Sequence, residues 1–229
     1  MAVKAFVSWS SGKDSACALA EAQRSGMAEI VGLLTTVNEA FDRVAMHGVR
    51  NSLLDRQIAA LGLPCVKVPL PHPCPMAAYE ARMAEASAIV KARGADHLIF
   101  GDLFLEDVRA YREAQLGRVG LRGLFPLWGR ATRVLAEAMI KGGFTAYVAC
   151  LDPKQLDRGF AGRRFDPSFL AALPMTVDPC GERGEFHTVV TDGPVFQTPI
   201  EVIVGETVDR DGFVFTDIIP HENRGSGVL

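Results

Sequence analysis

The sequence predicts an α/β fold for most of the chain, followed by a smaller α+β unit. Three observations lead to this prediction. Apolar, β-prone runs alternate with segments of helical periodicity up to about residue 101. Glycine follows each of those helical segments. Beyond residue 143 the pattern changes to strand-like runs separated by Asp-Gly pairs. Repeated alternation of strand and helix is typical of a parallel sheet covered by helices on both faces.

The elements of the first part follow in order from residue 3. Val3 to Trp9 is apolar and predicts the first strand. The helical segments end at glycines, which are common C-caps because they adopt left-handed backbone angles without strain. We expect helices at residues 14–25, 49–61 and about 76–93, and further strands at 29–37, 65–70 and 97–101. Parallel sheets of this kind bind ligands at the carboxyl ends of their strands.

The last part of the chain reads differently. Strands are expected at residues 144–151, 185–191, 199–208 and 213–219. The pairs Asp192-Gly193 and Asp211-Gly212 are turn signals between them. We place the boundary at the Gly142-Gly143 pair, which gives one domain over 1–142 and a second domain over 143–229.

Composition excludes several classes of protein. The chain has 229 residues, with 24 Lys and Arg against 27 Asp and Glu, a net charge of −3. The absence of a basic bias does not favour nucleic-acid or membrane binding. Five cysteines without a CxxC pair support neither a disulfide framework nor a zinc site. With no signal peptide and no apolar run near the roughly 20 residues of a bilayer span, we expect a cytoplasmic protein.

The segment SSGKDS, Ser10 to Ser15, connects the first strand to the first helix. It is not a P-loop, because that motif needs a glycine at the position of Val7 and Ser or Thr directly after Lys13. Helix N-terminal N–H groups, Gly12 and Lys13 together still favour anion binding. Ser10 and Ser15 can donate hydroxyl hydrogen bonds to an anion.

Two residues of this segment have alternative interpretations. Asp14 could hold Mg²⁺ or order the loop. Equally, Ser11 or Asp14 could simply be the N-cap of a helix. The residues alone leave anion binding and capping open.

A second group of chemical interest is CGERGEFHT, from Cys180 to Thr188. Glu182 and Glu185 each follow a glycine, and His187 comes two residues later, so two carboxylates and an imidazole could bind ammonium, transfer protons or ligate a metal. The residues alone favour a plainer interpretation, a polar turn that leads into an alternating strand.

A third group follows the strand at 97–101. Asp102 comes at a strand's carboxyl end, where it would face the cleft. The charges that follow are typical of a solvated helix face, with Arg109 and Glu113 paired at i,i+4 and Arg112 in solvent. His47 could approach a ligand or cap a helix.

The hexapeptide resembles the PP-loop motif Ser-Gly-Gly-Lys-Asp-Ser of the N-type ATP pyrophosphatases, with Ser11 where the motif usually has glycine. With DPCGERGEFHTVVTDGPVF (178–196), Gly101-Asp102 and Pro126-Leu127-Trp128, the chain is similar to the diphthine–ammonia ligase family over almost its whole length. The resemblance implies a doubly wound, HUP- or Rossmann-like parallel sheet of five strands in the order 3-2-1-4-5.

The resemblance also implies an activity. It is ATP-dependent amide formation through an adenylate, from ammonia and an acceptor carboxylate, with release of AMP and pyrophosphate and with ATP and Mg²⁺ as cofactors. In the family the acceptor is diphthine, a modified histidine of an elongation factor; a small metabolite acid is the alternative. A nucleotide sensor without acceptor chemistry and a tRNA-modifying enzyme are the competing functions, and a homodimer is compatible with any of them.

The resemblance further assigns residues to roles. Catalysis is assigned to Lys13, Glu182, Glu185 and His187. ATP is assigned to Ser10, Ser11, Gly12, Lys13, Asp14 and Ser15, with adenine near Leu34 and Thr35 after the second strand, and Asp14 is the metal candidate. The acceptor is assigned to His47, Gly101, Asp102, Gly181, Gly184 and Thr188.

Overall fold

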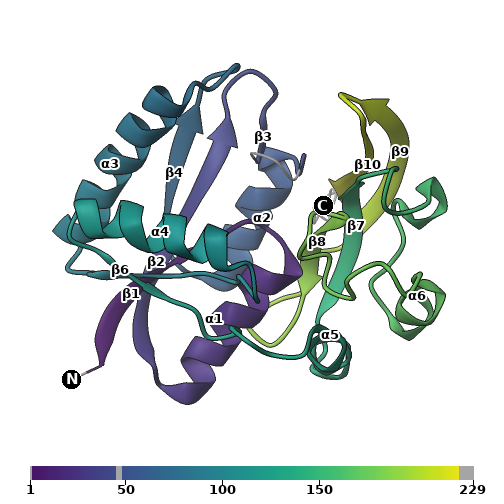
Figure 1. Cartoon of the computed structure of the whole chain (residues 1–229), viewed down its shortest axis with the longest axis horizontal. Coiled ribbons are helices and arrows are strands. Elements are labelled where there is room, and N and C mark those ends of the chain that lie inside the picture. Colours follow the sequence, from purple (N-terminus) through teal and green to yellow (C-terminus); the bar gives the residue numbers. More distant parts are fainter. Residues whose placement is uncertain (1, 45–47, 222–229) are drawn as a thin grey trace, which may run out of the picture.

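The structure is a computed structural model that describes residues 2–44 and 48–221. It consists of two parts, each built on its own sheet, that lie side by side in Figure 1. The N-terminal part contains a mostly parallel sheet with helices around it. The C-terminal part contains an antiparallel sheet with further helices beside it.

Five strands of the N-terminal sheet run parallel, as the sequence predicted. They are β1 (Val3–Ser8), β2 (Ala28–Asn38), β4 (Cys65–Leu70), β5 (His97–Ile99) and β6 (Arg122–Leu124). Their spatial order is β4-β2-β1-β5-β6. Counting only these parallel strands, this is 3-2-1-4-5, so the predicted order is confirmed. The short strand β3 (Arg43–Val44) pairs antiparallel with the end of β2.

Helices cover both faces of this sheet. They are α1 (Lys13–Ser25), α2 (Asn51–Leu61), α3 (Met76–Ala92) and α4 (Glu106–Arg118). Leu19 of α1 and Leu53 of α2 belong to one buried cluster, whereas Val90 of α3 and Leu116 of α4 belong to another. This is the doubly wound arrangement. Gly26 and Gly62 end α1 and α2 with φ values of 63° and 64°, as their sequence positions predicted.

The C-terminal part is α+β. Its four-stranded antiparallel sheet has the order β8-β7-β10-β9. The elements are β7 (Thr145–Leu151), η1 (Arg158–Phe160), α6 (Pro167–Ala172), β8 (Phe186–Asp192), β9 (Val202–Arg210) and β10 (Phe213–Pro220), after α5 (Thr132–Lys141). One buried cluster runs from β1 through α5 to β7 and β8, so the two parts share a core. The boundary proposed at residue 142 stays a prediction.

Of the two turns predicted at Asp-Gly pairs, one is a hairpin turn in the structure and the other is not. Asp211 and Gly212 both have positive φ, 52° and 83°, between the paired residues Arg210 and Phe213. This is the two-residue hairpin turn that the sequence predicted. Asp192-Gly193 is not a hairpin turn, because β8 and β9 occupy opposite edges of the sheet.

The junction between the two parts contains a charged cluster. The Asp217 carboxylate on β10 pairs with Arg50 at the start of α2 and lies 3.2 Å from Arg43 of β3. These bonds attach β10 to the carboxyl-end side of the N-terminal sheet. None of the described helices has the length and apolarity to cross a bilayer.

Candidate active site

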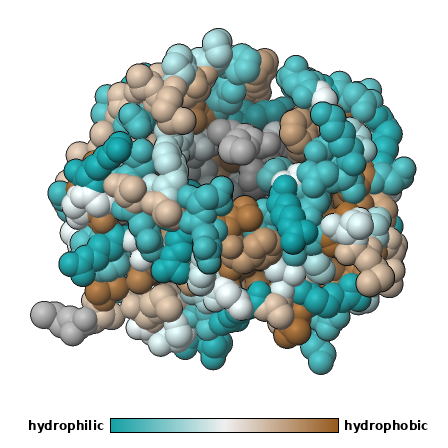
Figure 2. Space-filling view, in the orientation of Figure 1, coloured by the Kyte–Doolittle hydropathy of each residue, from teal (hydrophilic) through white to brown (hydrophobic). Residues whose placement is uncertain are grey.

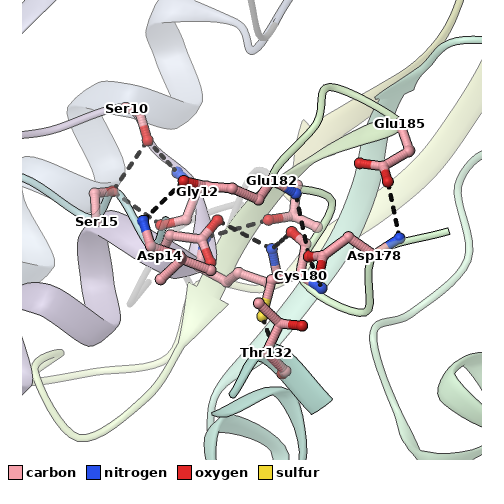
Figure 3. Close-up of polar contacts among 12 residues, drawn as sticks. Ser10, Gly12, Asp14, Ser15, Thr132, Asp178, Cys180, Glu182 and Glu185 are labelled. Atoms are coloured by element: carbon pink, nitrogen blue, oxygen red, sulfur yellow. Dashed lines mark hydrogen bonds and ion pairs between the residues drawn. The ribbon is translucent and has the colours of Figure 1, made fainter. Parts of the chain in front are cut away.

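The segment after β1 forms a tight loop that opens α1. Gly12 is the N-cap with extended angles, φ −92° and ψ 168°, and no side chain caps the helix. The alternative that Ser11 or Asp14 serves as the N-cap is therefore wrong. The Ser15 hydroxyl donates to the Gly12 carbonyl at 2.9 Å and lies 3.2 Å from the Ser10 hydroxyl (Figure 3). The two serines thus close the loop on itself.

Ser11 has a left-handed backbone, with φ 69°. This conformation costs a residue with a side chain roughly 1–2 kcal/mol, which explains why the PP-loop motif has glycine at this position. The Ser11 carbonyl accepts hydrogen bonds from the Val190 amide at 2.9 Å and from Gln57 Nε2 at 3.1 Å. Its hydroxyl is buried and has no hydrogen-bond partner among the described residues.

The Lys13 side chain is directed into the molecule. It is 1% exposed, and its ammonium donates to the Cys180 carbonyl at 2.5 Å and lies 3.0 Å from Asp14 Oδ2. The rings of Phe165 and Phe186 lie 5.2 Å from it. Burial acts to lower the pKa of Lys13, but the adjacent acidic groups, Asp14 first, raise it overall. The charged ammonium therefore joins the loop to the turn that contains Cys180.

That turn is organised by Glu185, which is 1% exposed. One carboxylate oxygen accepts from the Asp178 amide at 2.8 Å, and the other accepts from the Arg183 amide at 2.9 Å. Figure 3 shows the carboxylate directed toward Asp178 and away from the loop. Gly181 has φ 73°, and a Cβ there would lie 2.6 Å from a backbone oxygen. Gly184 also has a positive φ, 83°, but open space around it.

Glu182 reaches across from this turn to the N-terminal part. Its carboxylate accepts from the Leu103 amide at 2.7 Å, just beyond the end of β5. Burial, together with the charges of Asp14 and Asp102, raises the pKa of Glu182 to about 7, although the bond from Leu103 and the charge of Lys13 oppose this. Such a carboxyl group can both take and release a proton near neutral pH.

Strand β8, which follows the turn, carries two further predicted residues, His187 and Thr188. The Thr188 hydroxyl is buried and accepts from the Lys13 amide at 3.2 Å, so it holds the first residue of α1. Burial lowers the pKa of His187 to about 4. At neutral pH its imidazole is therefore uncharged and cannot act as a cation.

The end of β5 touches the start of α1. A Cβ on Gly101 would lie 2.7 Å from the Asp14 carbonyl carbon and 2.9 Å from the Ser15 nitrogen, so this contact requires glycine. The neighbouring Asp102 carboxylate is paired with Arg112 of α4 at 2.7 Å. The expectation that Arg112 lies in solvent is therefore wrong.

The i,i+4 pair on the same helix is confirmed, because Arg109 and Glu113 lie 2.9 Å apart. Leu34 and Thr35 lie inside β2, which continues to Asn38, so their expected position after the strand is corrected. The Leu34 carbonyl accepts from the Trp9 amide at 2.8 Å. His47 lies outside the described residues.

Among the described residues, buried side-chain atoms without a hydrogen-bond partner occur on the loop and on strand β2. They are Ser11 Oγ, Asp14 Oδ1 and Thr35 Oγ1. Unpaired polar atoms are costly to bury and point to a missing ligand. The described residues contain no group of three His, Cys, Asp or Glu side chains placed to hold a metal. Asp14 Oδ1 nevertheless fits Mg²⁺, which usually takes one or two carboxylates together with substrate phosphates.

Two hollows in the surface of the described residues lie away from the loop. One of about 410 Å³ is lined by residues of β7, β8 and the segment before β9, and one of about 290 Å³ lies between α5 and α6. Figure 2 shows a face on which hydrophilic and hydrophobic residues are interspersed. The Lys13 side chain and the turn that contains Cys180 pack against the loop. Neither of the two hollows is lined by loop residues.

One residue that contacts the loop was not identified from the sequence. Gln57 lies on α2, fully buried, and contacts both the loop and β8. Its signal was present, because it is a polar residue on the apolar face that contains Leu53, Leu54 and Leu61. A polar residue at a core position indicates a specific hydrogen-bonding task.

The order of the parallel strands and the loop between β1 and α1 define a PP-loop protein of the ATP pyrophosphatase type. Residues 3–123 match the family model described as the diphthamide synthase N-terminal domain, and residues 131–219 match the one described as the diphthamide synthase C-terminal domain. The chain belongs to this family, which implies an enzyme that uses ATP. No curated protein matches the chain.

Proposed function

We propose that the protein is an ATP-dependent ligase that converts an acceptor carboxylate and ammonia into an amide, with release of AMP and pyrophosphate. The observation that carries the proposal is the set of unpaired polar atoms on the loop, Ser11 Oγ and Asp14 Oδ1, opposite the Glu182 carboxyl group. The family assignment supports the same chemistry.

The reaction has two steps. The acceptor carboxylate attacks the α-phosphate, and the bond between the α- and β-phosphates breaks to release pyrophosphate. Ammonia then attacks the acyl carbon, AMP leaves with its oxygen, and one proton is set free. Bound Mg²⁺ would neutralise phosphate charge and orient the polyphosphate.

The loop residues have binding roles in this scheme. Amides of the first turn of α1 beyond Lys13 would bind an anion, and the helix dipole favours negative charge there. The Ser10 and Ser15 hydroxyls would join them by turning away from each other and from the Gly12 carbonyl. Asp14 Oδ1 is the carboxylate for Mg²⁺. Lys13 supplies positive charge directly behind the loop and fixes the Cys180 turn against it.

Glu182 is the proposed base. Its pKa near 7 suits it to accept the proton that ammonia loses. Glu185 contributes by shaping the turn, since both of its oxygens already accept backbone hydrogen bonds. The acceptor is then expected beside Gly181, Glu182 and Asp102. Diphthine on an elongation factor and a small carboxylic acid are the two candidates.

The proposal is tested by product analysis with ATP labelled at the α-phosphate, Mg²⁺, ammonium and each acceptor candidate. AMP and pyrophosphate are the expected products, and their formation should require the acceptor. ADP with phosphate would refute the scheme, and binding of ATP without turnover for any acceptor would favour a nucleotide sensor. Glu182→Gln is expected to slow amide formation about 100-fold or more, whereas Glu206→Gln, an exposed residue of β9, should not.

A further inference from the structure

Gln57 is buried, and both the oxygen and the nitrogen of its side-chain amide make hydrogen bonds. Its Nε2 donates to the Ser11 carbonyl at 3.1 Å and to the Val190 carbonyl at 2.7 Å. Its Oε1 accepts from the Trp9 indole N–H at 3.1 Å. One side chain of α2 therefore contacts the end of β1, the nucleotide loop and strand β8.

The contact with Ser11 determines the orientation of one peptide group. In a trans peptide the carbonyl and the following N–H point in opposite directions. The Ser11 carbonyl is held on one side by Gln57 and the Val190 amide. The Gly12 N–H must then point to the other side, where in this structure it donates to the Ser10 hydroxyl oxygen at 3.4 Å. The side chain of Gln57 thus determines the direction in which the Gly12 N–H points.

Ser11 also needs this support more than glycine would. Its φ of 69° is strained for a residue with a side chain, and such a conformation persists only where the surroundings determine it. The hydrogen bonds that Gln57 Nε2 and the Val190 amide donate to the Ser11 carbonyl stabilise this conformation. Without Gln57 the Ser11 backbone can leave the left-handed region, and the Ser11–Gly12 peptide with its N–H then changes orientation.

We propose that Gln57 is a positioning residue for the nucleotide loop, which holds Ser11 in its left-handed conformation and aims the Gly12 N–H at the bound phosphates. The inference rests on the proposed function in one respect, the binding of ATP by this loop. Gln57 does not touch the nucleotide; it acts through the Ser11–Gly12 peptide and links that peptide to β8.

The test is a double-mutant cycle on ATP affinity with Gln57→Met and Ser11→Gly, measured by titration calorimetry on the full chain. Gln57→Met should weaken ATP binding about tenfold, equivalent to about 1.4 kcal/mol. Ser11→Gly also removes the Ser11 hydroxyl, so its effect on ATP affinity is compared between the two backgrounds. The effect should be about threefold more favourable in the Gln57→Met background than in the wild type, because glycine adopts positive φ without support. Equal effects of Ser11→Gly in both backgrounds would overturn the proposal.

A matched control separates positioning from general destabilisation. Thr216→Val removes a buried hydrogen bond, to the Thr207 hydroxyl at 2.8 Å, in the sheet of the C-terminal part. It should lower stability without changing ATP affinity, and Ser11→Gly should not rescue it. If Thr216→Val weakens ATP binding as much as Gln57→Met does, the effect is only structural and the proposal fails.

Two further readouts need no ligand. The Trp9 indole N–H resonance should move upfield in Gln57→Met, with Trp128→Phe used to assign it. In urea unfolding, Ser11→Gly should stabilise the Gln57→Met chain more than the wild type; if Gln57→Met alone does not fold, the double variant should fold. Failure of either result counts against Gln57 as the support of Ser11. A wild type that binds no ATP would refute the proposed function, while these two readouts would still decide the role of Gln57.

Discussion

The raised pKa of Glu182 predicts a particular dependence of stability on pH. In the folded chain this pKa is about 7, against an ordinary value of 4.5. The folded state therefore holds the proton more tightly than the unfolded state does. It follows that the stability due to this group is fully present below about pH 4.5 and is lost as the pH rises through about 7.

The size of the effect follows from the same values. A pKa displaced from 4.5 to about 7 corresponds to about 3 kcal/mol for a group without solvent contact. Glu182 is only partly buried, so screening by water reduces this to on the order of 1 kcal/mol. In Glu182→Gln the side chain is neutral at every pH and keeps an oxygen that can accept from the Leu103 amide.

The assay is urea unfolding of the wild type and Glu182→Gln at about pH 5 and about pH 8. The variant should match the wild type at the lower pH and exceed its free energy of unfolding by on the order of 1 kcal/mol at the higher pH. The exposed Glu206→Gln serves as the control and should differ equally from the wild type at both pH values. A difference for Glu182→Gln that does not change with pH would refute the reasoning.

Three other predictions follow from the site. Glu185→Gln should lower the free energy of unfolding by about 2 kcal/mol in urea titrations, since an amide group would face two backbone N–H donors; unchanged stability with lost amidation would instead give Glu185 a chemical role. Gly101→Ala should weaken ATP binding at least about tenfold in calorimetry, because its Cβ would meet the backbone of Asp14. Gly117→Ala, with open space around it, is the matched control and should leave ATP affinity unchanged. His187 ring resonances should stay constant in NMR titrations between about pH 5.5 and 8, where an ordinary histidine titrates; a midpoint near neutrality would contradict the effect of burial.

The sequence was informative where local chemistry decides the structure. The glycine C-caps, the Asp211-Gly212 hairpin and the pair of Arg109 with Glu113 each depend on residues within a few positions of one another. The order of the five strands came from the resemblance, since periodicity alone does not show which strands are neighbours. Position 192–193 shows this limit, because an Asp-Gly pair signals a turn but not the pairing of the flanking strands.

Partners distant in sequence could not be predicted. The Leu103 amide and Glu182 are 79 positions apart, and the Lys13 amide and Thr188 are 175 apart. The resemblance assigns Glu185 to catalysis, and the sequence does not show that both of its oxygens accept backbone hydrogen bonds. Arg112 looked solvated because its partner lies before the helix and not on it.

The contacts between the loop and the C-terminal part are made largely by main-chain groups. The Ser11 carbonyl accepts a hydrogen bond from the Val190 amide. The Lys13 amide donates to the Thr188 hydroxyl oxygen, and the Lys13 ammonium donates to the Cys180 carbonyl. A PP-loop domain cut from this chain would expose those groups to water and lose the shape of its loop. The nucleotide-binding domain therefore cannot be transferred to another protein by itself. A graft would have to include strand β8 and the turn before it.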